Sequence, residues 1–159
     1  MIPIRAGTAA DIEPLLDVWE ALMACGTEAD PRFRMARGAR PHMRDYMRSW
    51  FAPQPFPPVF LAEHDGALVG AVRGFPSLIV PVVERAPTVR IGDLYVADAY
   101  RRQGLARRLV DTLLLSAREA GYPRAEVGTL TLDARAVAFW KGVGFGDWMV
   151  TLSREPESP

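Results

Sequence analysis

The sequence has 159 residues, of which 49% are hydrophobic and 24% are charged, a balance typical of an ordinary globular domain. Its 19 basic and 19 acidic residues cancel, which argues against a global attraction to nucleic acid or to an acidic membrane. Cys25, the single cysteine, excludes an internal disulfide and suits a reducing cytosol. No apolar run approaches the ~20 residues that span a bilayer, and the N-terminus lacks the apolar stretch of a secretory signal. We therefore predict one cytoplasmic domain over residues 1–159, with neither a nucleic-acid nor a membrane partner.

The first half of the chain is predicted to form a strand, two helices and a hairpin. Residues 2–7 predict a short strand, and Thr8 is expected to cap the helix that follows. The pattern then gives way to a polar, arginine-rich segment over residues 25–40, before a second helix that Pro41 opens. Residues 59–75 predict two strands around a turn at His64-Asp65-Gly66. Apolar residues at helical spacing mark the two helices: Ile12, Leu15, Leu16, Trp19, Leu22 and Met23 in the first, and Met43, Tyr46, Met47, Trp50 and Phe51 in the second.

The second half alternates strands and helices. A proline-containing connection leads to a predicted strand over residues 88–96, and an amphipathic helix follows Gly104 and ends at Gly121. A strand over residues 124–132, a short helix capped by Asp133, and a last strand over residues 147–152 complete the order. This order predicts an α/β (α+β) fold, with a mixed, largely antiparallel central sheet of about six or seven strands and flanking helices.

The junction at residues 100–106, YRRQGLA, has the features of an anion site. Gly104 and Ala106 place almost no side-chain bulk at the predicted start of a helix, where backbone amides and the helix dipole favour a negative charge. Arg101 and Arg102 can add charge-assisted hydrogen bonds. Arginines alone would suit a solvated turn, but a glycine in the first turn costs roughly 1 kcal/mol relative to alanine and calls for a reason. A Walker loop is absent, and the glycines of residues 142–146 precede a predicted strand instead of opening a helix.

The spacing Arg101-x-x-Gly104-x-Ala106 after a strand resembles the acyl-CoA motif of the GNAT superfamily of N-acyltransferases. A second stretch, DARAVAFWKGVGF, is similar to another motif of that family, with Asp133 in the asparagine place and Trp140 in the tyrosine place. The resemblance extends along nearly the whole chain. It implies a splayed parallel pair formed by residues 91–96 and 125–130, acetyl-CoA as donor, direct acetyl transfer to a primary amine of a small molecule or a peptide, and a homodimer. It also implies a set of acetyl-CoA contacts: Leu94, Tyr95, Val96, Arg101, Arg102, Gln103, Gly104, Leu105, Ala106, Asp133, Ala136 and Trp140.

The catalytic residues stay unknown at this stage. An alkylamine has a pKa of ~10.4, so a general base must accept a proton before the amine can attack. The family's base lies on the strand face of positions 90, 92 and 94, where this chain has Arg90 and Gly92, and alternation sends Asp93 to the opposite face unless a bulge intervenes. Trp140 cannot replace a tyrosine as general acid. Water, Glu63, Glu84 or a nucleophile of low pKa all remain open as the route of the proton.

Two other functions compete with an acetyltransferase. Gly92 and Trp140 favour a catalytically weak or silent acyl-CoA sensor or interaction module, and the junction alone would suit a phosphate-binding protein that does not use CoA. His42, His64 and Cys25 have no metal-site spacing, so we expect no metal. An arginine set around the second helix could bind an acceptor carboxylate or phosphate, but a solvated face balanced by Glu28, Asp30 and Asp45 is favoured. Its members are Arg32, Arg34, Arg37, Arg40, Arg44 and Arg48.

Overall fold

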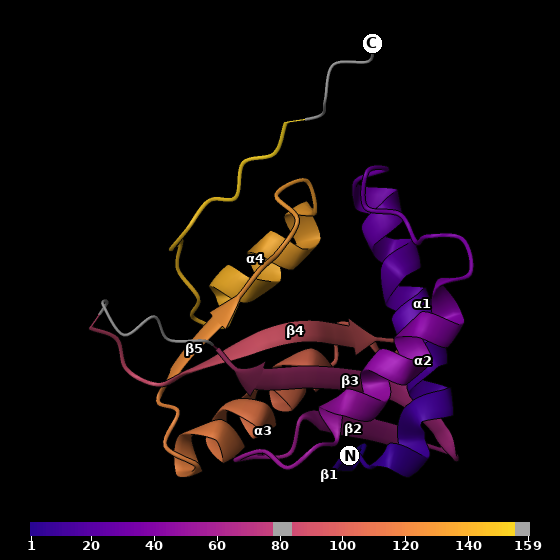
Figure 1. Ribbon diagram of the computed structural model, residues 1–159, viewed down its shortest axis with the longest axis horizontal. Helices are drawn as coiled ribbons and strands as arrows, with labels where there is room; N and C mark the ends of the chain where they lie inside the picture. The colour runs from indigo at the N-terminus through magenta and orange to yellow at the C-terminus, as the bar shows by residue number, and fades with distance from the viewer. Residues whose placement is uncertain (78–83, 155–159) are drawn as a thin grey trace.

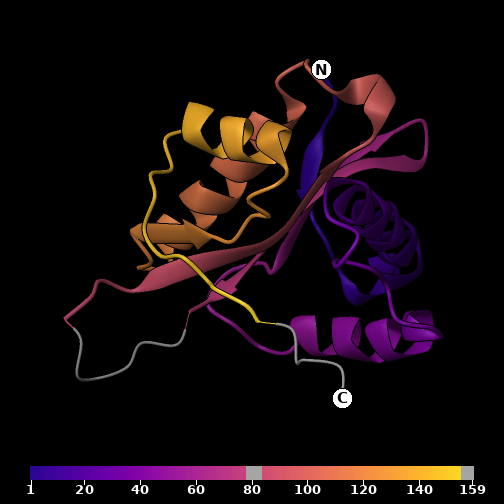
Figure 2. The same cartoon turned by 90° about the horizontal axis from the view of Figure 1, so that it is seen from above.

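The computed structural model describes residues 1–77 and 84–154 as three layers, in which a mixed sheet lies between two pairs of helices (Figures 1 and 2). Two short 3₁₀ helices, Ala9–Asp11 and Asp98–Tyr100, precede α1 and follow β4. The elements run in the order β1 (Ile4–Ala6), α1 (Ile12–Ala29), α2 (Ala39–Trp50), β2 (Val59–His64), β3 (Ala67–Pro76), β4 (Thr88–Val96), α3 (Leu105–Glu119), β5 (Arg124–Val127) and α4 (Ala134–Gly142).

The sheet keeps its strands in chain order, β1-β2-β3-β4-β5. The first three pairings are antiparallel, and only β4 and β5 run parallel. Their pairing starts at Thr88 with Arg124 and ends at Ile91 with Val127. Beyond that point β4 continues through residues 92–96 without β5 beside it, and the two strands diverge (Figure 1). The splayed parallel pair that the resemblance implied is therefore present.

Each face of the sheet has its own core. Helices α1 and α2 cover one face, where Leu16, Met47 and Leu61 are almost fully buried. Helices α3 and α4 cover the other face, where Leu109 and Leu113 are fully buried (Figure 2). Helical spacing in the sequence correctly identified these faces, because a stripe of apolar side chains forms a stable helix only where it can be buried.

Local signals in the sequence are also confirmed. Asp65 and Gly66 both have positive φ angles, 50° and 75°, as a two-residue hairpin turn between twisted strands requires. The Asp133 side chain caps α4 by accepting a hydrogen bond from the Ala136 amide at 3.0 Å. The predicted cap at Thr8 is displaced by one short element: Thr8 precedes the 3₁₀ helix Ala9–Asp11, its amide donates to Asp11 Oδ2 at 2.8 Å, and Asp11 is the N-cap residue of α1.

Several predicted elements are wrong in extent. Helix α1 runs on to Ala29, past the predicted break at Cys25, and β5 ends at Val127 because Gly128 breaks the strand. Residues 147–152 form no strand, and exposed Trp148 and Met149 there have no ladder partner. The described residues thus contain five strands instead of six or seven. The predicted connection after Phe75 includes residues 78–83, which lie outside the described residues. Within the described part, no helix is long and apolar enough to cross a membrane.

Candidate functional site

The backbone between β4 and α3 forms a concave row of amide groups. Gly104 is the N-cap residue of α3 with a φ of 78°, and Arg102 also has a positive φ, 62°. None of the amides of residues 102–107 donates a hydrogen bond to another described residue. Such a run of unpaired N–H groups at a helix N-terminus forms a nest that attracts an anion. We call residues 102–107 the amide cradle.

Space in front of the amide cradle is open. A Cβ added to Gly104 would meet nothing within 4 Å, so the glycine faces solvent on its outer side. Leu105 is buried against the α3 core and anchors the first turn, while Ala106 is only partly buried. The small residues therefore keep the amides accessible to an incoming group, as the sequence suggested.

The Arg101 side chain braces the loop and does not extend over the amide cradle. Its Nε donates to the Val96 carbonyl at 2.8 Å, and its Nη1 lies 2.7 Å from Asp98 Oδ1. Its Nη2 lies 3.7 Å from Cys25 Sγ on α1. Gln103 acts similarly, because its side-chain amide donates to the Ala99 carbonyl at 3.0 Å. Both side chains fix the loop shape, and direct ligand contacts by them remain predictions.

The remaining predicted contacts lie along β4 and α4. Leu94 and Val96 pack toward α3, whereas Tyr95 packs toward α1. Ala136 is partly buried against the α3 core. Trp140 is only 7% exposed and packs edge-to-face on Phe145, with ring centroids 5.3 Å apart. The Trp140 indole is therefore a core side chain in this structure, and its contact with a cofactor stays a prediction.

A β-bulge in β4 changes which side chains share a face. Arg73 of β3 pairs with Asp93, and the next residue, Gly74, pairs with Ile91, which leaves Gly92 as the extra residue of β4. The expectation that positions 90, 92 and 94 share one face of the strand is therefore wrong. Past the bulge, Leu94 points toward α3 and Asp93 turns to the face of α1 and α2.

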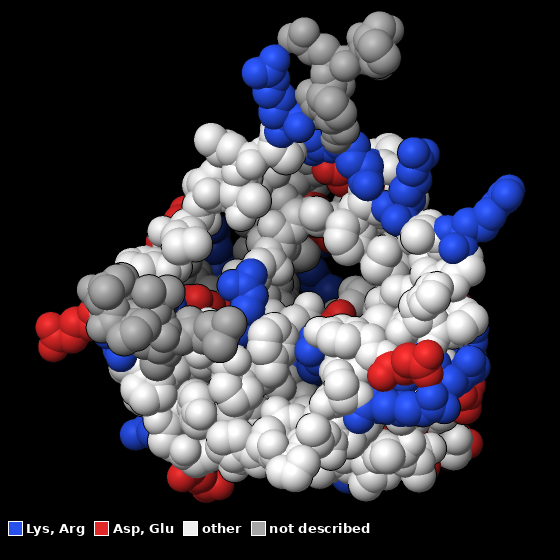
Figure 3. Space-filling model, viewed as in Figure 1, with Lys and Arg blue, Asp and Glu red and all other residues white. Residues whose placement is uncertain are grey.

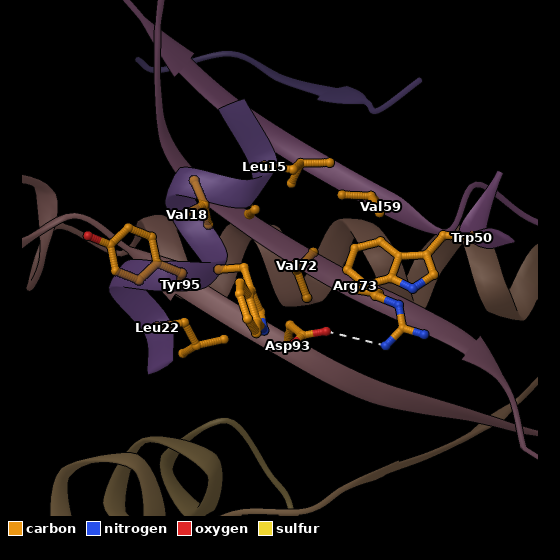
Figure 4. A pocket seen from close by; sticks show the side chains of 11 residues that line it. Leu15, Val18, Leu22, Trp50, Val59, Val72, Arg73, Asp93 and Tyr95 are labelled. Atoms are coloured by element: carbon orange, nitrogen blue, oxygen red, sulfur yellow. Dashed lines mark hydrogen bonds and ion pairs between the residues drawn. The ribbon is translucent and has the colours of Figure 1, made fainter. Parts of the chain in front are cut away.

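Asp93 meets Arg73 on that face. Arg73 Nη1 lies 3.3 Å from Asp93 Oδ2, as the dashed line in Figure 4 marks, and Arg73 Nη2 donates to the Tyr46 hydroxyl at 3.2 Å. The Arg73 guanidinium carbon also lies 4.1 Å from the ring centre of Trp50 and 4.5 Å from that of Phe75. Cation–π contacts of this kind hold a guanidinium in one place. Sequence reasoning missed Arg73 altogether.

The same contacts explain why position 92 is glycine. A Cβ at Gly92 would stand 2.7 Å from Arg73 Nη1 and 3.0 Å from Phe75 Cε1. The space that a side chain at position 92 would occupy is therefore filled by Arg73. A carboxylate is still present on this face, but the bulge supplies it from position 93.

Asp93 lies in an apolar setting. Burial raises the pKa of its carboxyl group, while the charge and hydrogen bond of Arg73 act in the opposite direction. Beside it is a cavity of about 20 Å³, lined by Trp19, Trp50 and other apolar side chains, which has room for about one water molecule. Tyr95 also lines this cavity, but its hydroxyl points away from Asp93 (Figure 4). Asp93 is thus the carboxylate best placed to exchange a proton on this face.

The other carboxylates that the sequence offered lie elsewhere. Glu63 accepts a hydrogen bond from Arg5 at 3.0 Å in a separate groove beside the β2–β3 turn, and Glu84 is exposed. The expected balance of the arginine set is confirmed in part, since Arg32 pairs with Asp30 and Arg48 pairs with Asp45. Arginines of α2 also pair with acidic residues of α1 that the sequence did not single out: Arg40 with Asp17 and Glu20, and Arg44 with Glu13.

Comparison with known proteins places this geometry in a family. A family profile described as Acetyltransferase (GNAT) family matches residues 15–145, which include most of α1, the bulged β4, the amide cradle and α4. The chain belongs to the GNAT acetyltransferase family. The amide cradle and the splayed strands both lie within the part of the chain that the family profile matches.

Individual relatives share either part of this chain's sequence or its whole fold. The chain is 33% identical over 86 residues to N-acetyltransferase 8 of Homo sapiens, a match that covers 54% of this chain and 37% of that protein. Its fold is similar to that of an aminoglycoside N-acetyltransferase, AAC(6′)-Iy, in complex with CoA, with a TM-score of 0.78, 14% identity, and coverage of 99% and 96%. It is also similar to a tetramutant of the BH1408 protein from Bacillus halodurans, with a TM-score of 0.80, 13% identity, and coverage of 98% and 100%.

Proposed function

We propose that this GNAT protein is an N-acetyltransferase that moves an acetyl group from acetyl-CoA to a primary amine. The observation that carries the proposal is the amide cradle at the open end of a splayed parallel pair. Six consecutive amides, from residue 102 to residue 107, have no hydrogen-bond partner among the described residues and face open space at Gly104. A diphosphate would satisfy these donors, and the α3 dipole would favour its charge.

The predicted contact set fits acetyl-CoA in outline. The diphosphate would lie against residues 102–106, and the pantetheine arm would follow β4 at Leu94 to Val96, on the edge where β5 no longer pairs with β4. The Val96 carbonyl already accepts from Arg101, so the arm would use other backbone groups of β4. In relatives that share this motif the helix corresponding to α4 borders the CoA tail, which gives Asp133, Ala136 and Trp140 a supporting role.

Asp93 is the proposed proton acceptor. An ammonium acceptor loses one proton to Asp93, through the one-water cavity or directly, and the neutral amine attacks the thioester carbonyl. The new C–N bond forms, the C–S bond breaks with its electron pair going to sulfur, and the amide nitrogen releases its second proton. One of the two released protons ends on the CoA thiol and the other enters solvent. Arg73 keeps the Asp93 carboxylate oriented and prevents its pKa from rising further.

A catalytically weak or silent acyl-CoA sensor is the second candidate. Its support in the sequence was the glycine at position 92 and the tryptophan at position 140. We call the sheet face on the side of α1 and α2 the acceptor face. The bulge weakens the first argument because it brings Asp93 to this acceptor face. The second argument keeps its force, since Trp140 is buried in the core and supplies no proton.

Amine-dependent release of free CoA distinguishes the two candidates. The protein is incubated with acetyl-CoA and a panel of primary amines, and the new thiol is measured with a disulfide reagent. Cys25 contributes a fixed background of one thiol per chain, which a blank without acetyl-CoA measures. Thiol release that needs both protein and amine supports the enzyme. Tight acetyl-CoA binding without such release for any amine supports the sensor.

The remaining sequence-based expectations keep their status as proposals. These are a single domain over residues 1–159, a cytoplasmic location and a homodimer. Sedimentation equilibrium of the purified chain measures the last of them directly: a mass of about twice 17.6 kDa supports the dimer, and a mass of 17.6 kDa contradicts it.

A further inference from the structure

The open part of the acceptor face is basic. Helices α1 and α2 cover the sheet as far as β3 and the Tyr95 end of β4. Beyond them the face continues over the rest of β4 and β5, around a hollow with blue side chains in and around it (Figure 3). Two carboxylates lie here, Asp93 and Glu126, and Glu126 is shared by Arg85 and Arg124. Four arginines thus share this face with only two carboxylates: Arg73, Arg85, Arg90 and Arg124.

Arg90 is the cation of this group that remains available. Its side chain is exposed and makes no ion pair or hydrogen bond with another described residue. The Arg73 side chain, in contrast, is only 12% exposed and is occupied by Asp93 and three aromatic rings. Arg90 Nη2 would lie 3.3 Å from a Cβ placed on Gly128, so the guanidinium reaches across the point where β4 and β5 separate.

Arg90 and Asp93 lie on the same face because of the bulge. Three positions of strand separate them, about 10 Å of backbone, and the long side chain of Arg90 can span much of that distance. A cation and a carboxylate arranged in this way match a ligand with the opposite order of charges. The ammonium group would meet Asp93, and an acidic group close to it would meet the Arg90 guanidinium, which binds carboxylates in a forked geometry.

We infer that the acceptor of this enzyme is an amine with a carboxylate on a neighbouring carbon, the arrangement of an α-amino acid, and that Arg90 binds this carboxylate. The inference rests on the proposed function for the position of the reacting amine. It makes Arg90 a residue that selects the acceptor and leaves Asp93 as the residue that takes the proton. Apolar and aromatic side chains that line the cavity beside Asp93, such as Leu22 and Trp50, suit an acceptor with an apolar side chain.

Direct binding of matched ligands tests the inference without relying on turnover. L-phenylalanine and L-phenylalaninamide differ only in the carboxylate, and L-leucine with L-leucinamide repeats the comparison. Each ligand is titrated calorimetrically into the protein alone and into the protein saturated with CoA. We expect each acid to bind about tenfold more tightly than its amide, which corresponds to one charge-assisted contact at a partly exposed site.

Variants of two arginines assign the preference to a residue. Arg90→Gln should reduce the ratio of acid to amide affinity to about one, and Arg90→Lys should keep part of it because the charge remains. Arg48→Gln is the matched control, since Arg48 is an exposed arginine on α2 that pairs with Asp45 away from this face. The control should keep the wild-type ratio.

Every outcome bears on the inference. Equal binding of acid and amide, absence of binding by all four ligands, or a ratio that survives Arg90→Gln would each overturn it. Tighter binding of phosphoethanolamine than of either amino acid would replace the carboxylate by a phosphate and would also overturn it. The proposed function fails separately, if the same protein does not bind acetyl-CoA or if the bound amino acids are not acetylated.

Discussion

The amide cradle and the acceptor face bind by different means. In the amide cradle the backbone supplies the donors, and the side chains of Arg101 and Gln103 only hold the loop in shape. On the acceptor face the backbone supplies a bulge, and the side chains of Arg73 and Asp93 supply the chemistry. A site built from backbone amides is recognisable from the spacing of small residues. A site built from side chains depends on strand register, which a single inserted residue reverses.

Disruption of the amide cradle should have the largest effect. Gly104→Glu introduces bulk, a negative charge and a side chain at a φ of 78°, all at the proposed diphosphate site. We expect acetyl-CoA affinity to fall by roughly 100-fold or more, since several charge-assisted hydrogen bonds are lost together. Isothermal titration with acetyl-CoA measures the change.

The other end of the same helix provides the control for this variant. Gly121 has a φ of 91° and open space around its Cα, so Gly121→Glu imposes similar backbone strain at the C-terminus of α3. It should lower the melting temperature by an amount similar to Gly104→Glu but leave acetyl-CoA binding intact. Equal loss of binding in both variants would mean that strain, and not the amide cradle, accounts for the effect.

Loss of the acceptor-face carboxylate should have the largest effect on the rate of transfer once acetyl-CoA is bound. Asp93→Asn should lower kcat/KM by roughly 10²–10⁴-fold, the usual contribution of a general base, with little change in acetyl-CoA affinity. Burial raises the Asp93 pKa above its ordinary 3.8, and the base acts only when ionised. Wild-type kcat/KM should therefore fall as the pH drops through that raised pKa, and the variant should lack this acidic limb.

Asp45→Asn is the matched control, because it removes an exposed carboxylate on α2 that pairs with Arg48 away from the acceptor face. Its pH profile should match that of the wild type. An Asp93→Asn enzyme that keeps wild-type kcat/KM and its acidic limb would exclude Asp93 as the proton acceptor.

Gly92→Ala, a smaller change at the bulge, should lower kcat/KM by an intermediate amount. The Cβ of Gly92→Ala would stand 2.7 Å from Arg73 Nη1, so Arg73 must move away from Asp93. We expect kcat/KM to fall about 10-fold to 100-fold, since a displacement of about 1 Å at a catalytic group has effects of this size. Gly142→Ala, where an added Cβ meets nothing within 4 Å, is the control. An unchanged kcat/KM for Gly92→Ala would mean that Arg73 does not position Asp93.

Restoring the family's tyrosine should have the smallest effect on rate. Trp140 is buried between Phe139 and Phe145, so Trp140→Tyr places a phenol in the core instead of in the cleft. We expect no gain in kcat and a loss of roughly 1–3 kcal/mol in the free energy of unfolding, as for other changes of shape in a packed core. A clear rise in kcat would mean that position 140 faces the leaving thiolate.

Much of the fold could be predicted because its signals are local. The turn at Asp65-Gly66, the cap at Asp133 and the glycine at position 104 each follow from the conformation that one residue must adopt. The predicted last strand over residues 147–152 failed for a different reason. Alternation of apolar residues indicates strand propensity, but a strand also needs ladder hydrogen bonds. The Arg124 side chain of β5 lies over the Trp148 ring, yet no described strand pairs with this segment.

The acceptor site was less accessible to sequence reasoning. A glycine inside a strand pattern is a signal for a bulge, and Gly92 carried that signal next to Asp93. The partner Arg73 gave no signal of its own, because its cross-strand pairing with Asp93 depends on the register that the bulge sets. The bracing role of Arg101 was equally hidden, since its spacing gives no sign that the side chain turns back to the Val96 carbonyl and to Asp98.

Calorimetric titration of the wild-type protein with acetyl-CoA, CoA and adenosine diphosphate tests the central claim most directly. Acetyl-CoA and CoA should bind at one site per chain, and salt should weaken their binding. Adenosine diphosphate should bind much less tightly because it lacks the pantetheine arm that follows β4. Absence of acetyl-CoA binding, or equally tight binding of adenosine diphosphate, would contradict that claim.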